Sequence, residues 1–170
     1  MTNYSLDAIY ILNSYLWDSL VNLEIIDPDN YFSDNLNSKV VVPILPVQQA
    51  PEFNQLLNGK THIIYDKINT TYDTNWMMCD EQFLYTIYAI SYSEINQIRN
   101  VFLDLFRRYD GSARDVQDWI YPAGNFKFHS ISVADISPTA PSDEIKGFFS
   151  TDITLNIKYS RITDELGRFA

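Results

Sequence analysis

The segment from Glu81 to Tyr92 (EQFLYTIYAISY) constrains the fold more than any other, because it alternates like a strand and is apolar on both faces. One face carries Phe83, Tyr85, Ile87 and Ala89, and the opposite face carries Leu84, Tyr88, Ile90 and Tyr92. A strand that is apolar on both sides lies in the centre of a sheet or places one face in a partner interface. The sequence therefore predicts a sheet that is built around this strand.

Two segments have the apolar spacing of amphipathic helices, one near the N-terminus and one directly after the central strand. The first is expected from Leu6 to Leu23, with Ser5 as its N-cap and the turn residues 27–30 as its end. The second begins at a capping box of Ser91 and Glu94, with Ser93 as a rival N-cap. The predicted core positions are Leu6, Ile9, Leu12, Leu16, Leu20 and Leu23 in the first helix, and Ile95, Ile98, Phe102, Leu105 and Tyr109 in the second.

Further segments have the β-branched or alternating composition of strands. The earliest contains Pro43 and Pro46, which cannot donate to a ladder, so it is expected at a sheet edge or as an extended arm. The last alternates cleanly and directs its large side chains inward. The predicted strands are residues 39–47, 61–69, 126–136 and 152–162, the inward residues of the last are Ile153, Leu155, Ile157 and Tyr159, and short helical turns are expected within 48–59 and 113–120.

The order of these elements predicts an α+β fold in a single domain that spans residues 1–170. Strands that follow one another with few crossovers favour a small, mostly antiparallel (mixed) sheet of about four to five strands, with the helices packed on one face. The connection Ser137–Gly147 is much longer than an ordinary hairpin loop, and it is expected to form a long hairpin arm.

Charge and cysteine content exclude several classes of protein. The net charge is −10 with dispersed acids, which disfavours a DNA-binding domain, because binding DNA needs cations that displace its counterions. The single cysteine, Cys79, cannot form an intramolecular disulfide, which fits a reducing, intracellular compartment. The sequence has neither a signal peptide nor an apolar run of about 18 residues, so a soluble chain without membrane segments is expected.

Residues with catalytic or metal-binding chemistry are scattered along the sequence. A general base or a metal ligand needs partners that converge on it, and neither histidine has an acid or a cysteine at ligand spacing. Glycine-rich phosphate loops and the G-x-S-x-G motif are absent from the sequence. We therefore predict no catalytic, cofactor-binding or metal-binding residues and do not expect an enzyme. The side chains considered for such roles are His62, His129, Cys79, Asp27 with Asp29, and Asp143 with Glu144.

The aromatic residues are the one feature that points toward a function, because the chain contains 12 tyrosines and 10 phenylalanines. Tyrosine is favoured at interfaces, where it offers apolar area with a polar tip, and ordinary core packing is the alternative. The proline-containing segments 40–51 and 137–147 also favour an interface, since long ordered loops are usually functional. The residues predicted for an inter-subunit or ring–ring interface are Pro43, Pro46, Pro51, Pro138, Pro141, Ile145, Tyr85 and Tyr88.

Several stretches of this sequence, taken in order, resemble the tail terminator and tail-completion (neck) proteins of long-tailed bacteriophages, particularly those with contractile tails. The resemblance is one of pattern, and it extends over roughly residues 1–165. It is carried by VVPILPVQQAPE at 41–52, HIIYD at 62–66, LYTIYAISY at 84–92 leading into the helix 94–109, and ITLNIKYS at 153–160.

The resemblance implies a structural virion protein, without catalysis or cofactor, that caps the head-proximal end of a tail as a hexameric ring. Such a ring ends tail polymerisation and joins the tail to the neck or head around a DNA channel. The implied partners are further copies of the chain, the tail tube or sheath protein, a neck or head–tail connector protein, and genomic DNA that passes without specific binding. Assembly takes place in the host cytoplasm, and Asp143 and Glu144 are the candidate acids of the channel lining.

Other roles remain open at this stage. The chain could cap the sheath instead of the tube, or it could be a head–neck connector subunit. A non-enzymatic adaptor or binding module of another phage-related or secretion apparatus is the runner-up, and an enzyme that uses scattered acids is a third alternative. Solution mass separates a ring from an adaptor, because a hexamer has six times the 19.8 kDa of one chain.

Overall fold

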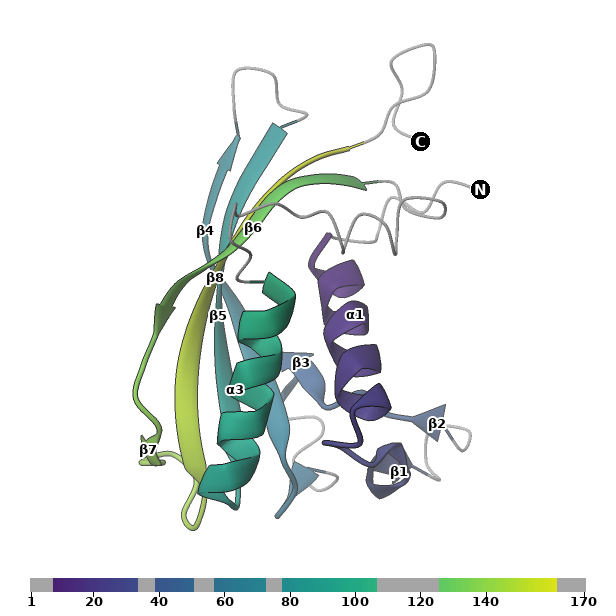
Figure 1. Cartoon of the computed structure of the whole chain (residues 1–170), viewed down its shortest axis with the longest axis vertical. Helices are drawn as coiled ribbons and strands as arrows, with labels where there is room; N and C mark the ends of the chain where they lie inside the picture. The colour runs from purple at the N-terminus through teal and green to yellow at the C-terminus, as the bar shows by residue number, and fades with distance from the viewer. Residues whose placement is uncertain (1–7, 34–38, 51–56, 73–77, 107–125, 162–170) are drawn as a thin grey trace.

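The computed structural model describes residues 8–33, 39–50, 57–72, 78–106 and 126–161, and Figure 1 shows their arrangement. Within these ranges two α-helices lie on one side of a six-stranded sheet, which confirms the predicted α+β class. The elements are α1 (Ala8–Asn22), η1 (Pro28–Tyr31), β1 (Phe32–Ser33), β2 (Lys39–Val40), β3 (Ile44–Pro46), β4 (His62–Tyr72), β5 (Met78–Ala89), α3 (Tyr92–Phe106), β6 (Phe126–Ile136), β7 (Ala140–Pro141) and β8 (Phe149–Arg161).

The sheet is mixed and mostly antiparallel, as expected. Its strand order is β3-β4-β5-β8-β6, and the short strand β7 adds to the N-terminal end of β8. β3 runs parallel to β4, whereas the other pairs of this sheet are antiparallel. β1 and β2 form a separate two-stranded sheet. The short strands β3 and β7 bring the main sheet to six strands, slightly above the predicted number.

β5 has the central position that its sequence predicts, because it pairs with β4 on one side and with β8 on the other. Its side chains toward the helices are almost fully buried, and they are Phe83, Tyr85, Ile87 and Ala89. The prediction for the opposite face is only partly right. Tyr88 is buried there, but Ile90 and Tyr92 are 55% and 52% exposed. The strand ends before these two residues, so they follow the geometry of a turn and a helix start.

α1 buries the stripe that its periodicity predicts, which consists of Ile9, Leu12, Leu16 and Leu20. The helix ends at Asn22, and Glu24 adopts a left-handed conformation (φ 56°) that turns the chain away from the helix axis. Leu23 is 61% exposed, so the prediction of a core position for it is wrong. The turn residues 27–30 lie beyond the helix end and contribute to η1. Residues 1–7, with the predicted N-cap, lie outside the described residues.

α3 starts at Ser91 and not at Ser93, because the Ser91 Oγ accepts a hydrogen bond of 3.2 Å from the Glu94 N–H. The Glu94 carboxylate accepts from the Thr61 hydroxyl at 2.7 Å, which links the helix to the start of β4. The predicted core positions are confirmed for Ile95, Ile98 and Phe102, which are buried, and for Leu105, which is partly buried. Outside the described residues lie Tyr109, the turn expected within 113–120, and residues 51–56 of the turn expected within 48–59.

The two edges of the main sheet are both interrupted. β3 forms one edge, as predicted for the proline-containing segment, and its last residue is Pro46, which has no N–H to donate. β6 forms the other edge of the described sheet, and its register with β8 shifts at 128–130 and again at 133–135. Prolines and bulges weaken the ability of an edge strand to accept another strand. Contacts with other chains are therefore expected to use side chains more than strand addition.

The arm (Ser137–Gly147) is a long connection, as predicted, but it folds back onto its own sheet. The Ser137 N–H donates to the Asp152 carbonyl at 2.8 Å, and the Ser142 N–H donates to the Phe148 carbonyl at 2.8 Å. Between these anchors, β7 pairs with the first residues of β8. The arm is therefore held against one end of the sheet (Figure 1).

Candidate functional site

The sheet has two different faces. α1 and α3 pack on one face, whereas no described helix covers the other, which we call the open face. The side chains of the open face are mostly polar and at least partly exposed, and they include Ile64, Asp66, Asp80, Leu84, Thr86, Asp135, Asp152, Thr154 and Asn156. One end of the open face is covered by the arm, and a cavity lies there.

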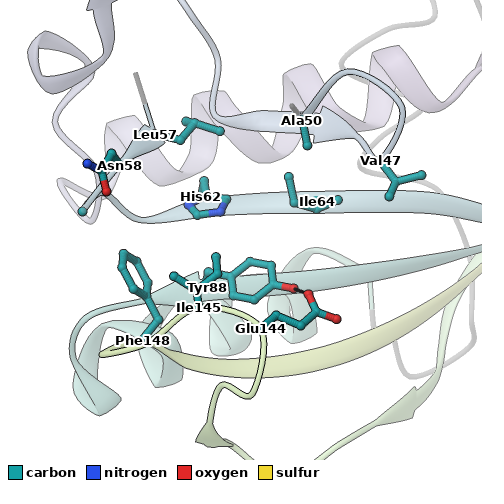
Figure 2. A pocket seen from close by; sticks show the side chains of 11 residues that line it. Val47, Ala50, Leu57, Asn58, His62, Ile64, Tyr88, Glu144, Ile145 and Phe148 are labelled. Carbon is teal, nitrogen blue, oxygen red and sulfur yellow. Dashed lines mark hydrogen bonds between the residues drawn. The ribbon is translucent and has the colours of Figure 1, made fainter. Parts of the chain in front are cut away.

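This cavity, which we call the arm pocket, has a volume of about 490 Å³. Figure 2 shows that β4 and β5 form its floor, while the turn after β3 and the arm form its sides. Most of its walls are apolar, and its size lies in the range of ordinary ligand sites. The lining residues are Val47, Ala50, Leu57, Asn58, Gly59, His62, Ile64, Tyr88, Glu144, Ile145 and Phe148.

A short hydrogen bond joins the sheet to the arm inside this pocket. The Tyr88 hydroxyl donates to Glu144 Oε2 at 2.5 Å (Figure 2). Burial, followed by this hydrogen bond, raises the pKa of Tyr88 well above its ordinary value, so the phenol remains protonated. The Ser142 Oγ accepts from the backbone N–H groups of Glu144 and Ile145, each at 3.2 Å, which fixes the turn that carries the carboxylate. The arm therefore presents Glu144 as an acceptor with a defined position.

His62 is the second polar group with a defined orientation in the arm pocket. Its Nδ1 lies 2.8 Å from the Lys60 carbonyl oxygen, and since a carbonyl only accepts, Nδ1 carries the proton. Burial lowers the pKa of His62 below its ordinary value, against the opposing effect of the Lys60 carbonyl, so the ring is neutral. The ring stacks on Tyr88 with centroids 5.1 Å apart and meets Phe148 edge-on at 6.1 Å. Nε2 is consequently an unprotonated acceptor.

The polar groups of the arm pocket that have a defined orientation are hydrogen-bond acceptors. The pocket's two oriented polar groups, His62 Nε2 and the Glu144 carboxylate, both accept hydrogen bonds. The protons on His62 Nδ1 and on the Tyr88 hydroxyl are already donated to oxygens of the chain itself. In the described ranges, moreover, no three His, Cys, Asp or Glu side chains gather as metal ligands would. The arrangement favours recognition of a donor-rich group.

Three of the residues singled out from the sequence meet in this pocket. Tyr88 and Ile145, predicted for an interface, line it together with Glu144, which was predicted for a channel lining. Asp143 is exposed beside the pocket and is absent from its lining. The sequence showed no acid or cysteine at ligand spacing from His62, and in the structure its Nδ1 pairs with the Lys60 carbonyl. Nothing in the sequence indicates that His62 and Glu144 would line the same pocket.

Two further predicted interface residues, Tyr85 and Pro43, are buried and do not line the arm pocket. Tyr85 is 1% exposed and donates to Asn13 Oδ1 at 2.7 Å, because the pleat of β5 directs it toward the helices. Pro43 directly precedes β3, and its carbonyl accepts from the Ile63 N–H at 2.8 Å. The other predicted interface prolines lie elsewhere: Pro46 is half-buried at a smaller cavity beside α1, Pro138 and Pro141 are exposed on the arm, and Pro51 lies outside the described residues.

A second polar cluster lies on the helix-covered face. Glu81 is 5% exposed, forms an ion pair of 3.1 Å with Lys67, and accepts a hydrogen bond from the Tyr159 hydroxyl. Burial, followed by the bond to Glu81, raises the pKa of Tyr159. Cys79, which pairs with Tyr159 across the strands, is buried beside it. Because Glu81, Tyr159 and Cys79 are buried and Glu81 is paired with both Lys67 and Tyr159, the cluster contributes to the core.

His129 lies apart from both clusters, on β6. Its Nε2 is 2.9 Å from the Ser160 Oγ, and the ring is exposed. Burial, followed by the nearby Lys127 and Lys158 charges, lowers its pKa. Among the described residues no carboxylate forms a hydrogen bond with it, and it does not line the arm pocket.

Comparison with known proteins gives no family assignment. The sequence matches no protein-family model, and no curated protein has a significantly similar sequence. Among the described helices, none is both long and apolar enough to span a membrane.

Proposed function

We propose that this chain is a structural subunit that caps the head-proximal end of a bacteriophage tail as a hexameric ring. In this role it ends the polymerisation of the tail and forms the joint to the neck or head. The chain then acts through surfaces and not through a reaction. Its partners are further copies of itself, the tail tube or sheath protein, a neck or connector protein, and DNA that passes through the channel.

The observation that carries this proposal is the one-sided sheet. Four long strands, β4, β5, β8 and β6, extend past the ends of both helices and leave the open face without a described helix (Figure 1). An antiparallel sheet tolerates one solvated face, but here that face is long and ends in a preformed pocket. A ring around a channel needs different inner and outer surfaces on each subunit, and the polar open face and the helical layer differ in this way.

The charge of the open face also supports a channel role. Asp80, Asp135 and Asp152 are exposed on it, and they outnumber Lys127 and Lys158, which are exposed on the same face. The whole chain has a net charge of −10, and an acidic chain repels phosphates, which suits a passage through which DNA moves without binding. We therefore add these three acids to Asp143 and Glu144 as candidates for the channel lining.

The experiment that tests the proposal combines solution mass with imaging. The purified chain is analysed by sedimentation, alone and with polymerised tail tubes, and the tubes are imaged by negative stain. We expect a six-fold ring near six times 19.8 kDa, or a cap on one end of each tube. Adding the chain during tube polymerisation should also shorten the tubes in proportion to its concentration.

The control is the same mixture with bovine albumin at equal concentration, which should leave tube lengths and tube ends unchanged. A chain that stays monomeric and never touches a tube would overturn the tail role and leave the adaptor as the better description. Caps on sheath ends in place of tube ends would assign the ring to the sheath.

A further inference from the structure

The arm pocket combines apolar walls with acceptors at one end. Val47, Leu57 and Ile64 line it on the β3–β4 side, and Ile145 and Phe148 line it on the arm side. A group that fills this volume needs an aliphatic or aromatic body, because burial of apolar surface is the main source of affinity.

The polar end selects for hydrogen-bond donors. Tyr88 uses one lone pair of Glu144 Oε2, and a carboxylate has about four such sites, so Oε1 and part of Oε2 are left for a ligand. His62 Nε2 adds a further acceptor from the pocket floor. In the described ranges the one ion pair is that of Lys67 with Glu81, so no described cation neutralises Glu144. A ligand with positive charge therefore complements this end.

We propose that the arm pocket binds an arginine side chain, with an adjacent apolar residue, from a different protein of the assembly. The guanidinium is planar and donates in a fork that matches the two oxygens of Glu144. His62 Nε2 is a further acceptor in the same lining for a donor of the bound segment. The aliphatic stem and the neighbouring apolar residue pack against the walls. Arginine is also enriched among the residues that dominate interface affinity.

The charge of the chain favours a different protein over a second copy. The net charge is −10, so an arginine on a cationic partner is attracted to the arm pocket more strongly than one on a second copy. Among the described side chains Arg99 is the one arginine, and it is half-buried on α3, so it is poorly placed to enter the pocket of a second copy.

The inference rests on the proposed function only in taking the partner to be a tail or neck protein.

The test uses a minimal probe, acetyl-arginyl-leucine amide, titrated into the full chain and followed by amide chemical shifts in two-dimensional NMR. We expect saturable shifts at His62, Tyr88 and Glu144. The same peptide with citrulline in place of arginine is isosteric and neutral, and it should bind about tenfold to a hundredfold more weakly, as for a lost hydrogen bond to a charged group. Equal binding of the citrulline peptide would overturn the proposal.

Two variants and one matched control locate the site. Glu144→Gln keeps an acceptor for Tyr88 but removes the charge, and Val47→Trp fills the pocket from its rim; each should weaken the arginine peptide at least about tenfold. Asp143→Asn removes a neighbouring exposed charge outside the pocket and should leave binding unchanged. If Asp143→Asn weakens the peptide as much as Glu144→Gln, the attraction is only that of an acidic surface and the pocket is not the site.

The tube assay separates this inference from the tail role. If the wild-type chain binds the arginine peptide more tightly than the citrulline peptide but never caps a tube, the arginine pocket is supported and the tail role is overturned. If it caps tubes but binds the two peptides equally, the tail role is supported and the arginine pocket is overturned. Agmatine has the guanidinium and the aliphatic stem of arginine but no peptide, so it stands for a free metabolite. A protein partner is supported if agmatine binds with at most about one tenth of the peptide's affinity, and equal affinity would overturn the assignment to a protein partner.

Discussion

The same strands form both faces of the sheet, but the side chains on the two faces differ in polarity and burial. Toward the helices, alternate residues of β5 and β8 are mostly large, apolar and buried. On the open face most residues between them are polar and at least partly exposed, and among the described residues of β4, β5 and β8 only His62 and Tyr88, beneath the arm pocket, are buried there. Stability is therefore concentrated on one face, which leaves the other free to carry recognition.

The largest expected effect is a core truncation on the covered face. Phe102 is fully buried and packs against Tyr85 and Phe106 with ring centroids 5.2 Å and 5.9 Å away. Phe102→Ala should lower the free energy of unfolding by about 3–5 kcal/mol, because it removes transfer free energy and leaves a cavity. Urea denaturation at constant m-value measures this. The open-face control Thr154→Ala should change stability by less than about 0.5 kcal/mol, and a similar loss for both would break the comparison.

A smaller effect is expected from removing one hydroxyl on each face. Tyr85→Phe leaves Asn13 Oδ1 without its donor inside the core, where Asn13 Nδ2 already has no partner among the described residues. We expect a loss of about 1–3 kcal/mol. Tyr88→Phe removes a hydrogen bond to Glu144, which water can replace because that carboxylate is exposed, so its cost should be below about 1 kcal/mol. Thermal and urea unfolding would contradict this order if Tyr88→Phe proved the more damaging change.

The turn at the end of the arm should be sensitive to backbone strain. Gly147 has φ 85°, where an added Cβ meets no atom within 4 Å, so Gly147→Ala introduces strain without a clash. We expect a loss of about 1 kcal/mol together with weaker binding of the arginine peptide, because this turn carries the pocket wall. Lys146→Ala, one residue earlier and exposed, is the control and should leave stability and binding near wild type.

The smallest effect is the contribution of His62 to the pH dependence of stability. Its pKa in the folded chain lies below its ordinary value, so the unfolded chain binds a proton first as the pH falls. The stability it contributes is complete above about pH 6.5 and declines as the pH falls through the folded pKa. His62→Gln should flatten the stability profile between pH 7.5 and 5.5. His129→Gln should flatten it less, since His129 is exposed, and equal flattening would remove the distinction between the pocket and the surface.

The sequence predicted the features that depend on local periodicity. The pleat of β8, the stripe of α1 and the Ser91 cap of α3 all follow from spacing between near neighbours. Leu23 was misassigned because the helix ends one residue before it, and nothing at Glu24 announces a left-handed residue. Apolar periodicity indicates which face of a helix is buried, but the residue at which the helix ends depends on the turn that follows it.

The arm pocket could not be derived from spacing, because it depends on contacts across the fold. His62 and Glu144 come from β4 and the arm, and the pairing that joins them passes through β5 and β8. The arm's length was evident, but its return onto β8 depends on the hydrogen bonds of Ser137 and Ser142. Tyr88 was identified as an interface residue, and the structure adds its hydrogen-bonded partner.

The interrupted edges of the sheet also affect how the free chain associates with other copies of itself. Open strand edges are where copies of a chain associate with one another before they reach a partner. Pro46 on β3 and the bulges of β6 reduce that risk without the cost of covering either edge with another element. The free chain is therefore expected to resist edge-to-edge association in solution.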